Sequence, residues 1–98
     1  MTNIKKIYLF RVTATATKNN KQAASGKQCT ILVFVYGTTI ESAEVEVHRE
    51  VKGHGWSNVT IEEKADFNTS TLDDAKTGVI QAYNNAVKDG IAMLIFPD

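Results

Sequence analysis

The spacing of hydrophobic residues changes along the chain and predicts six elements. Residues 4–17 alternate between apolar and polar side chains, which is typical of a half-buried strand. Residues 28–36 are apolar at successive positions in their middle, which indicates a strand buried on both faces. The polar segment between them, residues 18–27, cannot bury itself, so the two strands are expected to form an antiparallel hairpin.

A helix is predicted after the second strand. Thr38 followed by Glu41 forms a capping box, and Gly53 or Gly55 provides the left-handed stop. Residues 44–47 also alternate between glutamate and valine, as in a strand, but the cap and the stop favour the helix. The apolar stripe of this helix consists of Ile40, Ala43, Val47 and Val51.

The second half of the chain repeats the change from strand to helix. Residues 56–67 alternate as a half-exposed strand, and Glu63 occupies an apolar phase position, which indicates a bulge or the end of regular pairing. Residues 70–90 have an apolar stripe at helical spacing, with a hydroxyl residue as cap and a glycine as stop. Residues 91–96 form a short strand that is wholly apolar.

The order ββαβαβ over residues 1–98 predicts a single α+β domain with a four-stranded sheet and two helices. Strands joined through a helix normally run parallel, so the last three strands are expected to be parallel and the first antiparallel, in a mixed sheet. A two-layer sandwich, with both helices on one face, is favoured. The alternative places one helix on each face of the sheet, with the last strand central and the strand of residues 56–67 at an edge.

In the two-layer form, the sheet face opposite the helices is apolar. It carries either Leu32, Phe34 and Tyr36 or Ile31, Val33 and Val35, beside residues of the last strand such as Leu94. An exposed apolar face of this kind usually contacts a partner, and the commonest partner is a second copy of the chain. The first hypothesis is therefore a homodimeric interaction module that binds a protein partner without catalysis.

The charge of the chain is unevenly distributed although its total is zero. The first forty residues contain six lysines and arginines and no acid, whereas the rest contains five cations and all eleven acids. Lys18, Lys21 and Lys27 lie in the hairpin segment, so binding of nucleic acid or another polyanion is the second hypothesis. No aromatic residue in this segment is available to stack on bases, which favours an ordinary solvated turn. Self-association is a further use of the charge split, with the basic segment of one copy facing acids of another.

Targeting and redox signals are weak. Arg11 interrupts the only apolar run near the start, so neither a secretory signal nor a membrane span is expected. Cys29 is the single cysteine, which is compatible with a reducing compartment. A cytoplasmic location is the resulting expectation.

No catalytic residue, metal site or cofactor is predicted. His48, His54 and Cys29 do not match a zinc spacing. Neighbouring residues of a regular strand point to opposite faces, so Glu62 and Glu63 are not expected to converge. A third hypothesis, a small enzyme or ligand-binding domain with its site between subunits, depends only on the apolar phase of Glu63.

Overall fold

The computed structural model describes residues 4–21, 23–67 and 77–97. These residues form one compact α+β domain, which confirms the predicted fold class and the order ββαβαβ. The predicted start of the second helix lies outside the described residues. The elements are β1 (Lys6–Ala16), β2 (Gln28–Gly37), α1 (Ile40–Gly53), β3 (Trp56–Asp66), α2 (Thr77–Asp89) and β4 (Ile91–Pro97).

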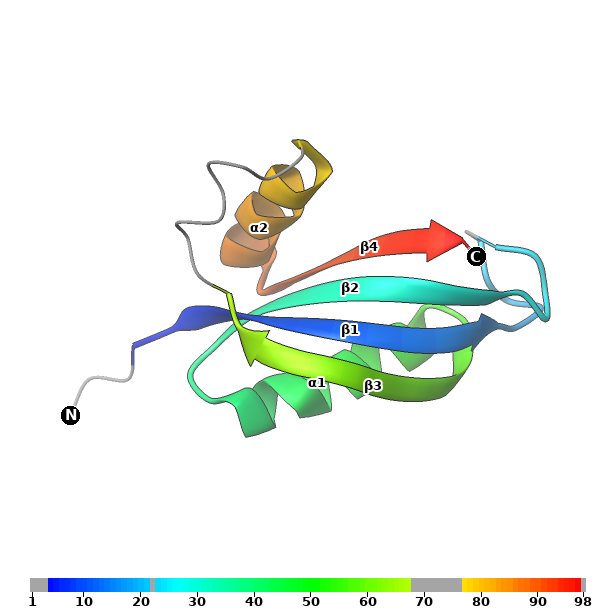
Figure 1. Cartoon of the computed structure of the whole chain (residues 1–98), viewed down its shortest axis with the longest axis horizontal. Helices are drawn as coiled ribbons and strands as arrows, with labels where there is room; N and C mark the ends of the chain where they lie inside the picture. Colours follow the sequence, from blue (N-terminus) through cyan, green and yellow to red (C-terminus); the bar gives the residue numbers. More distant parts are fainter. Residues whose placement is uncertain (1–3, 22, 68–76, 98) are drawn as a thin grey trace.

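The sheet has the order β3-β1-β2-β4, and every neighbouring pair is antiparallel (Figure 1). The prediction of a mixed sheet is therefore wrong. That prediction assumed that strands joined by a helix become neighbours, but β1 lies between β2 and β3. β3 ends beside Tyr8 and β4 begins beside Val35, and these two residues pair with each other. The connection through α2 thus starts and finishes at the same end of the sheet, which makes β3 and β4 antiparallel.

One face of the sheet, the α1 face, holds most of the core. Phe10 and Val12 of β1 lie fully buried beside Ile31 and Val33 of β2, and α1 packs across them. In Figure 1 this helix runs behind the strands. Burial of these side chains is the largest favourable contribution that the described residues make to folding. The helix residues that close this core are Ala43, Val47 and Val51, all from the predicted stripe.

The opposite face, the α2 face, carries a second and smaller cluster. Ile7 and Phe34 are buried there against Ala82 and Ala86 of α2. The two-layer arrangement favoured from the sequence is therefore not found. The alternative is confirmed in having one helix on each face and β3 at an edge, but β4 lies at the other edge and not in the centre. The physical reason is that β2 is apolar on both sides, so each side requires a cover. Figure 1 shows that α2 lies beside the start of β4, and the remainder of β4 runs on without a helix over it.

The first helix begins one residue later than the capping box predicted. Thr39 is the N-cap, and its Oγ1 accepts a hydrogen bond of 3.2 Å from the backbone N–H of Ser42. The helix ends at Gly53, and Gly55 follows with a positive φ of 89°. Both glycines named in the sequence therefore lie at the end of α1, and Gly55 is the one with left-handed backbone.

The hairpin loop between β1 and β2 is attached to the turn after α1. The backbone N–H and Oγ1 of Thr17 and the side-chain amide of Asn20 all donate to the carbonyl oxygen of Gly55, at 2.9, 3.0 and 3.0 Å. A Cβ on Gly55 would lie 2.8 Å from the Cα of Asn20. Only glycine therefore satisfies both the backbone conformation and the close approach of the loop.

Substitution of Gly55 by alanine is expected to lower the free energy of unfolding by about 1–3 kcal/mol, because it adds backbone strain and a steric clash. Urea denaturation followed by circular dichroism measures this loss. Gly53→Ala is the matched control, since nothing lies within 4 Å of its Cβ position and its φ is not in the left-handed range. Equal losses in the two variants would contradict the proposed role of the loop contact.

Candidate interaction surface

The two edges of the sheet differ in chemistry. β3 forms one edge, and its register with β1 shifts twice, between Arg11 and Val12 and between Thr13 and Thr15. The first shift lies beside Glu63, which confirms the bulge indicated by the sequence. Bulges and charged side chains are the usual means by which an exposed edge avoids pairing with another strand. The charged residues of this edge are Glu62, Glu63, Lys64 and Asp66.

The opposite edge, formed by β4, has none of these protections between Ile91 and Phe96. The backbone N–H of Tyr36 donates to the carbonyl oxygen of Gly90 at 2.9 Å. Hydrogen bonding alternates along an antiparallel pair, so the even-numbered residues of β4 bond to β2. The N–H and C=O groups of Ile91, Met93 and Ile95 therefore face outward. Within the described residues no strand pairs with this row, which we call the β4 edge.

The apolar residues singled out in the sequence lie on the α2 face. Phe34 is fully buried, and its ring meets Phe67 edge-on at a centroid distance of 5.4 Å. Leu32, Tyr36 and Leu94 are partly buried in the same cluster. The face expected to be open is thus covered at this end by the chain's own helix, because α2 crosses to it.

Exposed large apolar side chains occur on α2, at Ile80 and Val87, and near the end of β4, at Phe96. Phe96 is 47 % exposed, and it continues the row of side chains begun by Ala92 and Leu94. Thr30 of β2 pairs with Phe96 and is only partly buried. The outward backbone groups of the β4 edge and the exposed ring of Phe96 belong to the same strand, and we call them together the β4 surface.

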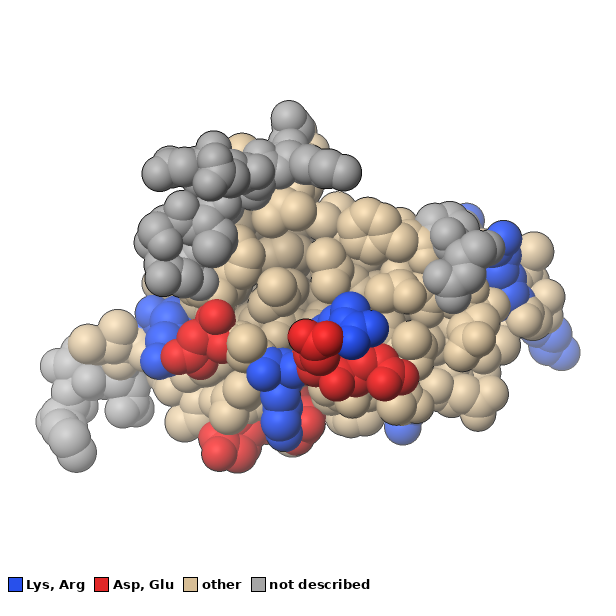
Figure 2. Space-filling model, in the orientation of Figure 1, with Lys and Arg blue, Asp and Glu red and all other residues tan. Residues whose placement is uncertain are grey.

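Part of the charge split is resolved inside the fold. Lys6 pairs with Asp66 at 2.9 Å and Arg11 pairs with Glu63, so cations of β1 meet acids of β3. The hydrogen bond to Asp66 and the negative charge of that carboxylate raise the pKa of Lys6. On the face in view, Figure 2 shows basic and acidic side chains next to one another.

The hairpin lysines, unlike Lys6 and Arg11, have no described ion-pair partner. Lys18, Lys21 and Lys27 are exposed, and the described part of the chain provides no ion-pair partner for any of them. At the hairpin end of the molecule, Figure 2 shows basic side chains and no acidic ones on the face in view. This end therefore carries a positive charge that the described residues do not neutralise.

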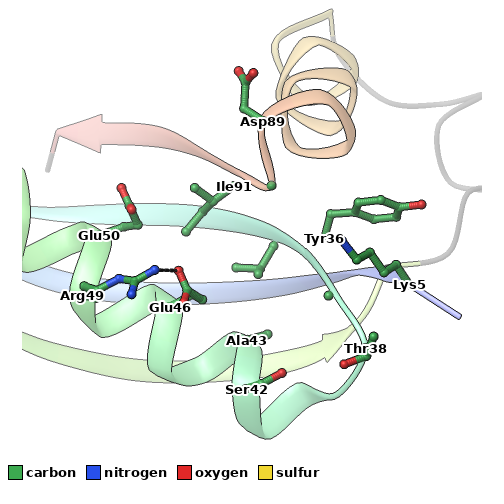
Figure 3. Close-up of a pocket in the computed structure, with 13 residues that line it drawn as sticks. Lys5, Tyr36, Thr38, Ser42, Ala43, Glu46, Arg49, Glu50, Asp89 and Ile91 are labelled. Carbon is green, nitrogen blue, oxygen red and sulfur yellow. Dashed lines mark hydrogen bonds and ion pairs between the residues drawn. The ribbon is translucent and has the colours of Figure 1, made fainter. Parts of the chain in front are cut away.

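A cleft of about 410 Å³ opens between α1 and the start of β4 (Figure 3). Glu46 in its wall pairs with Arg49 of the same helix. Glu50 and Asp89 also line the cleft, and neither has an ion-pair partner among the described residues. Ile91 supplies an apolar side between them. Lys5 also lines the cleft, so its described lining carries three carboxylates against two cations, and the cleft lies next to the β4 edge.

The remaining candidates for chemistry do not form a site. Cys29 is fully buried, and no group of three metal-ligating side chains occurs in the ranges that the structure describes. The bulge does turn Glu62 and Glu63 toward the same face, contrary to the expectation for a regular strand. Glu62 accepts a hydrogen bond from Thr13, and Glu63 pairs with Arg11. Both glutamates are exposed in the single chain.

The two histidines lie in different surroundings on and after α1. His48 is partly buried on α1, whereas His54 is exposed in the turn after it. His54 lines a shallow hollow with Lys21 of the hairpin loop, beside Gly53 and Gly55. The carbonyl end of α1 also lies here, and its partial negative charge disfavours a bound anion.

The chain matches no protein-family model, no curated protein and no solved structure. No helix of the described residues is long and apolar enough to cross a membrane. The function therefore has to be argued from the geometry of the chain itself.

Sequence reasoning missed the β4 edge and the two acids of the cleft. The absence of charge in residues 91–96, against four charges in residues 62–66, was a usable signal for an unprotected edge. Glu50 and Asp89 had no such signal, because nothing in their spacing shows that a helix and a distant turn meet.

Phe34→Ala is expected to lower the free energy of unfolding by about 3–5 kcal/mol, because it opens a cavity beneath α2. Phe96→Ala removes a half-exposed ring and is expected to cost less than about 1 kcal/mol in the isolated chain. Urea denaturation at one low protein concentration compares the two. A small loss for Phe34→Ala would contradict its placement in the second cluster.

Proposed function

We propose that this chain is a protein-interaction module that associates with a second copy through the β4 surface and has no catalytic role. The two β4 strands pair antiparallel about a two-fold axis, so the two sheets become continuous. The observation that carries this proposal is the contrast between the two edges: β3 is bulged and charged, whereas β4 is regular and apolar.

The backbone of the β4 edge is available for pairing with another strand. The outward N–H and C=O groups of Ile91, Met93 and Ile95 can pair with another strand, as in β-strand addition. β3 has residues that protect an edge from pairing, so their absence from residues 91–96 of β4 favours an edge that is paired in function. An identical strand in the antiparallel direction gives a closed dimer, because each copy then presents the same surface to the other.

The side chains of β4 support the same pairing. With Leu94 at the two-fold axis, Phe96 lies across from the partner's Ala92, and the large ring meets a small residue. The exposed ring and its apolar neighbours are then removed from water on both copies. This burial favours association at about 25 cal/mol per Å² before the entropic cost of binding is subtracted.

Phe96→Lys is expected to weaken self-association by at least about tenfold, because it places a charge at the new strand pair on both copies. Size-exclusion chromatography with light scattering, from about one to one hundred micromolar protein, gives the mass of each species. Val45→Lys is the control, since Val45 is 64 % exposed on α1 and points away from the buried stripe. A parent chain that stays monomeric throughout this range would overturn the proposal.

Ile95→Pro tests the backbone pairing separately from the side chains. Its N–H faces outward, so the substitution leaves the hydrogen bonds to β2 intact but removes a donor from the β4 edge. We expect a variant with the circular dichroism spectrum of the parent and at least about tenfold weaker association. A folded variant that dimerises as strongly as the parent would show that the copies meet elsewhere.

A further inference from the structure

We propose that the hairpin of each copy contacts the acidic cleft of the other, so that two ionic contacts flank the paired β4 strands. This inference rests on the dimer proposed above and specifies its direction and its electrostatics. It gives a role to the two sets of charges that the fold leaves unpaired: Lys18, Lys21 and Lys27 on the hairpin, and Glu50 and Asp89 at the cleft.

Within one copy these charges lie at opposite ends of β4. Pro97 pairs with Cys29, so β4 ends beside the residues that leave the hairpin. Ile91 pairs with Val35, so β4 begins at the cleft, next to Asp89. The strand between them spans about 20 Å at 3.4 Å per residue. The hairpin lysines therefore cannot reach the cleft of their own chain.

Antiparallel pairing of the two β4 strands brings the opposite ends together. When Leu94 lies at the two-fold axis, Pro97 of one copy faces the partner's Ile91. Lys27 is two residues beyond the row of Cys29 and Pro97, which puts it at about the level of the partner's Asp89. The two backbones are then two strand spacings apart, about 10 Å, and the long lysine side chain spans most of this gap.

The hairpin lysines and the cleft acids Glu50 and Asp89 have opposite signs, and the described residues pair with neither set. The cleft contributes two acids without described partners, and the hairpin contributes three lysines in the same condition. Lys27 and Asp89 are exposed, so each contact alone contributes little, but the two-fold axis doubles every pair. Opposed patches of this kind set the orientation of the two copies and speed their encounter, in a manner that salt screens.

Charge reversal in two separate variants tests the contact. Lys27→Glu places two acids together at each end of the dimer, and Asp89→Lys places two lysines together. Each variant alone is expected to self-associate about tenfold more weakly than the parent at 20 mM salt, and the difference shrinks at 500 mM. A mixture of the two variants regains attractive pairs at both ends, so a heterodimer of near-parental affinity is expected. Lys64→Glu on β3 makes the same change in net charge far from β4 and is the control.

The outcomes separate the two proposals. A monomeric parent overturns the dimer and this inference together, whereas a parental dimer unaffected by either reversal overturns the ionic contact and leaves strand pairing in place. Failure of the mixed variants to form a heterodimer also overturns it, because only contact between copies gives that rescue. The same variants are titrated with a fluorescent single-stranded oligonucleotide at low salt. Binding that Lys27→Glu abolishes, with self-association unchanged, would assign the hairpin to a polyanion instead.

Discussion

Burial of β2 on both sides is the constraint on which the rest of this structure depends. Its odd-numbered residues face α1 and its even-numbered residues face α2, and Phe34 is as deeply buried as Val33. A strand of this kind cannot sit at an edge or under a single layer of helices without exposing large side chains to water. β1 and β4 therefore flank it, and one helix covers each face. Among the described residues, α2 covers only one end of its face, so the described cover of that face is incomplete.

The incomplete cover connects the fold to the proposed function. β4 lies beside β2 and no described strand pairs with its outer side, so a strand without charged residues has an outward row of backbone groups. β3, at the other edge, is twice irregular and carries four charged residues, two of which pair with β1. The described chain thus has a sheet edge that is protected against pairing, β3, and one that lacks bulges and charges, β4. In the proposed dimer, continuation of the sheet through β4 leaves a bulged and charged β3 edge at each end.

The same division appears in the charges. Cations of β1 are neutralised by acids of β3 because the two strands are neighbours, and this accounts for part of the segregation seen along the sequence. The hairpin loop is anchored through Thr17 and Asn20 on the carbonyl of Gly55, which holds its lysines at one end of the molecule. The acids of the cleft lie at the other end. In the proposed dimer, a two-fold axis through β4 brings the hairpin lysines of one copy near the cleft acids of the other.

The amino-acid sequence by itself determined the elements, their order and the residues of the core. Periodicity reports which side of an element is apolar, so the stripe of α1, the two-sided burial of β2 and the bulge near Glu63 were all predictable. The cap of α1 was misplaced by one residue, because Thr38 and Thr39 have the same side chain and only the backbone decides which one accepts from Ser42.

The tertiary structure alone decided strand order, strand direction and the side to which α2 crosses. These depend on where distant segments meet, and periodicity carries no information about that. The residues Leu32, Phe34, Tyr36 and Leu94 were correctly read as apolar, but only the fold shows that α2 packs against them. Only the fold, likewise, makes β4 an edge and brings Glu50 and Asp89 into one cleft. The spacing of apolar residues identifies the faces that are unfavourable to expose to water. The tertiary structure determines which of these faces are buried within the same chain.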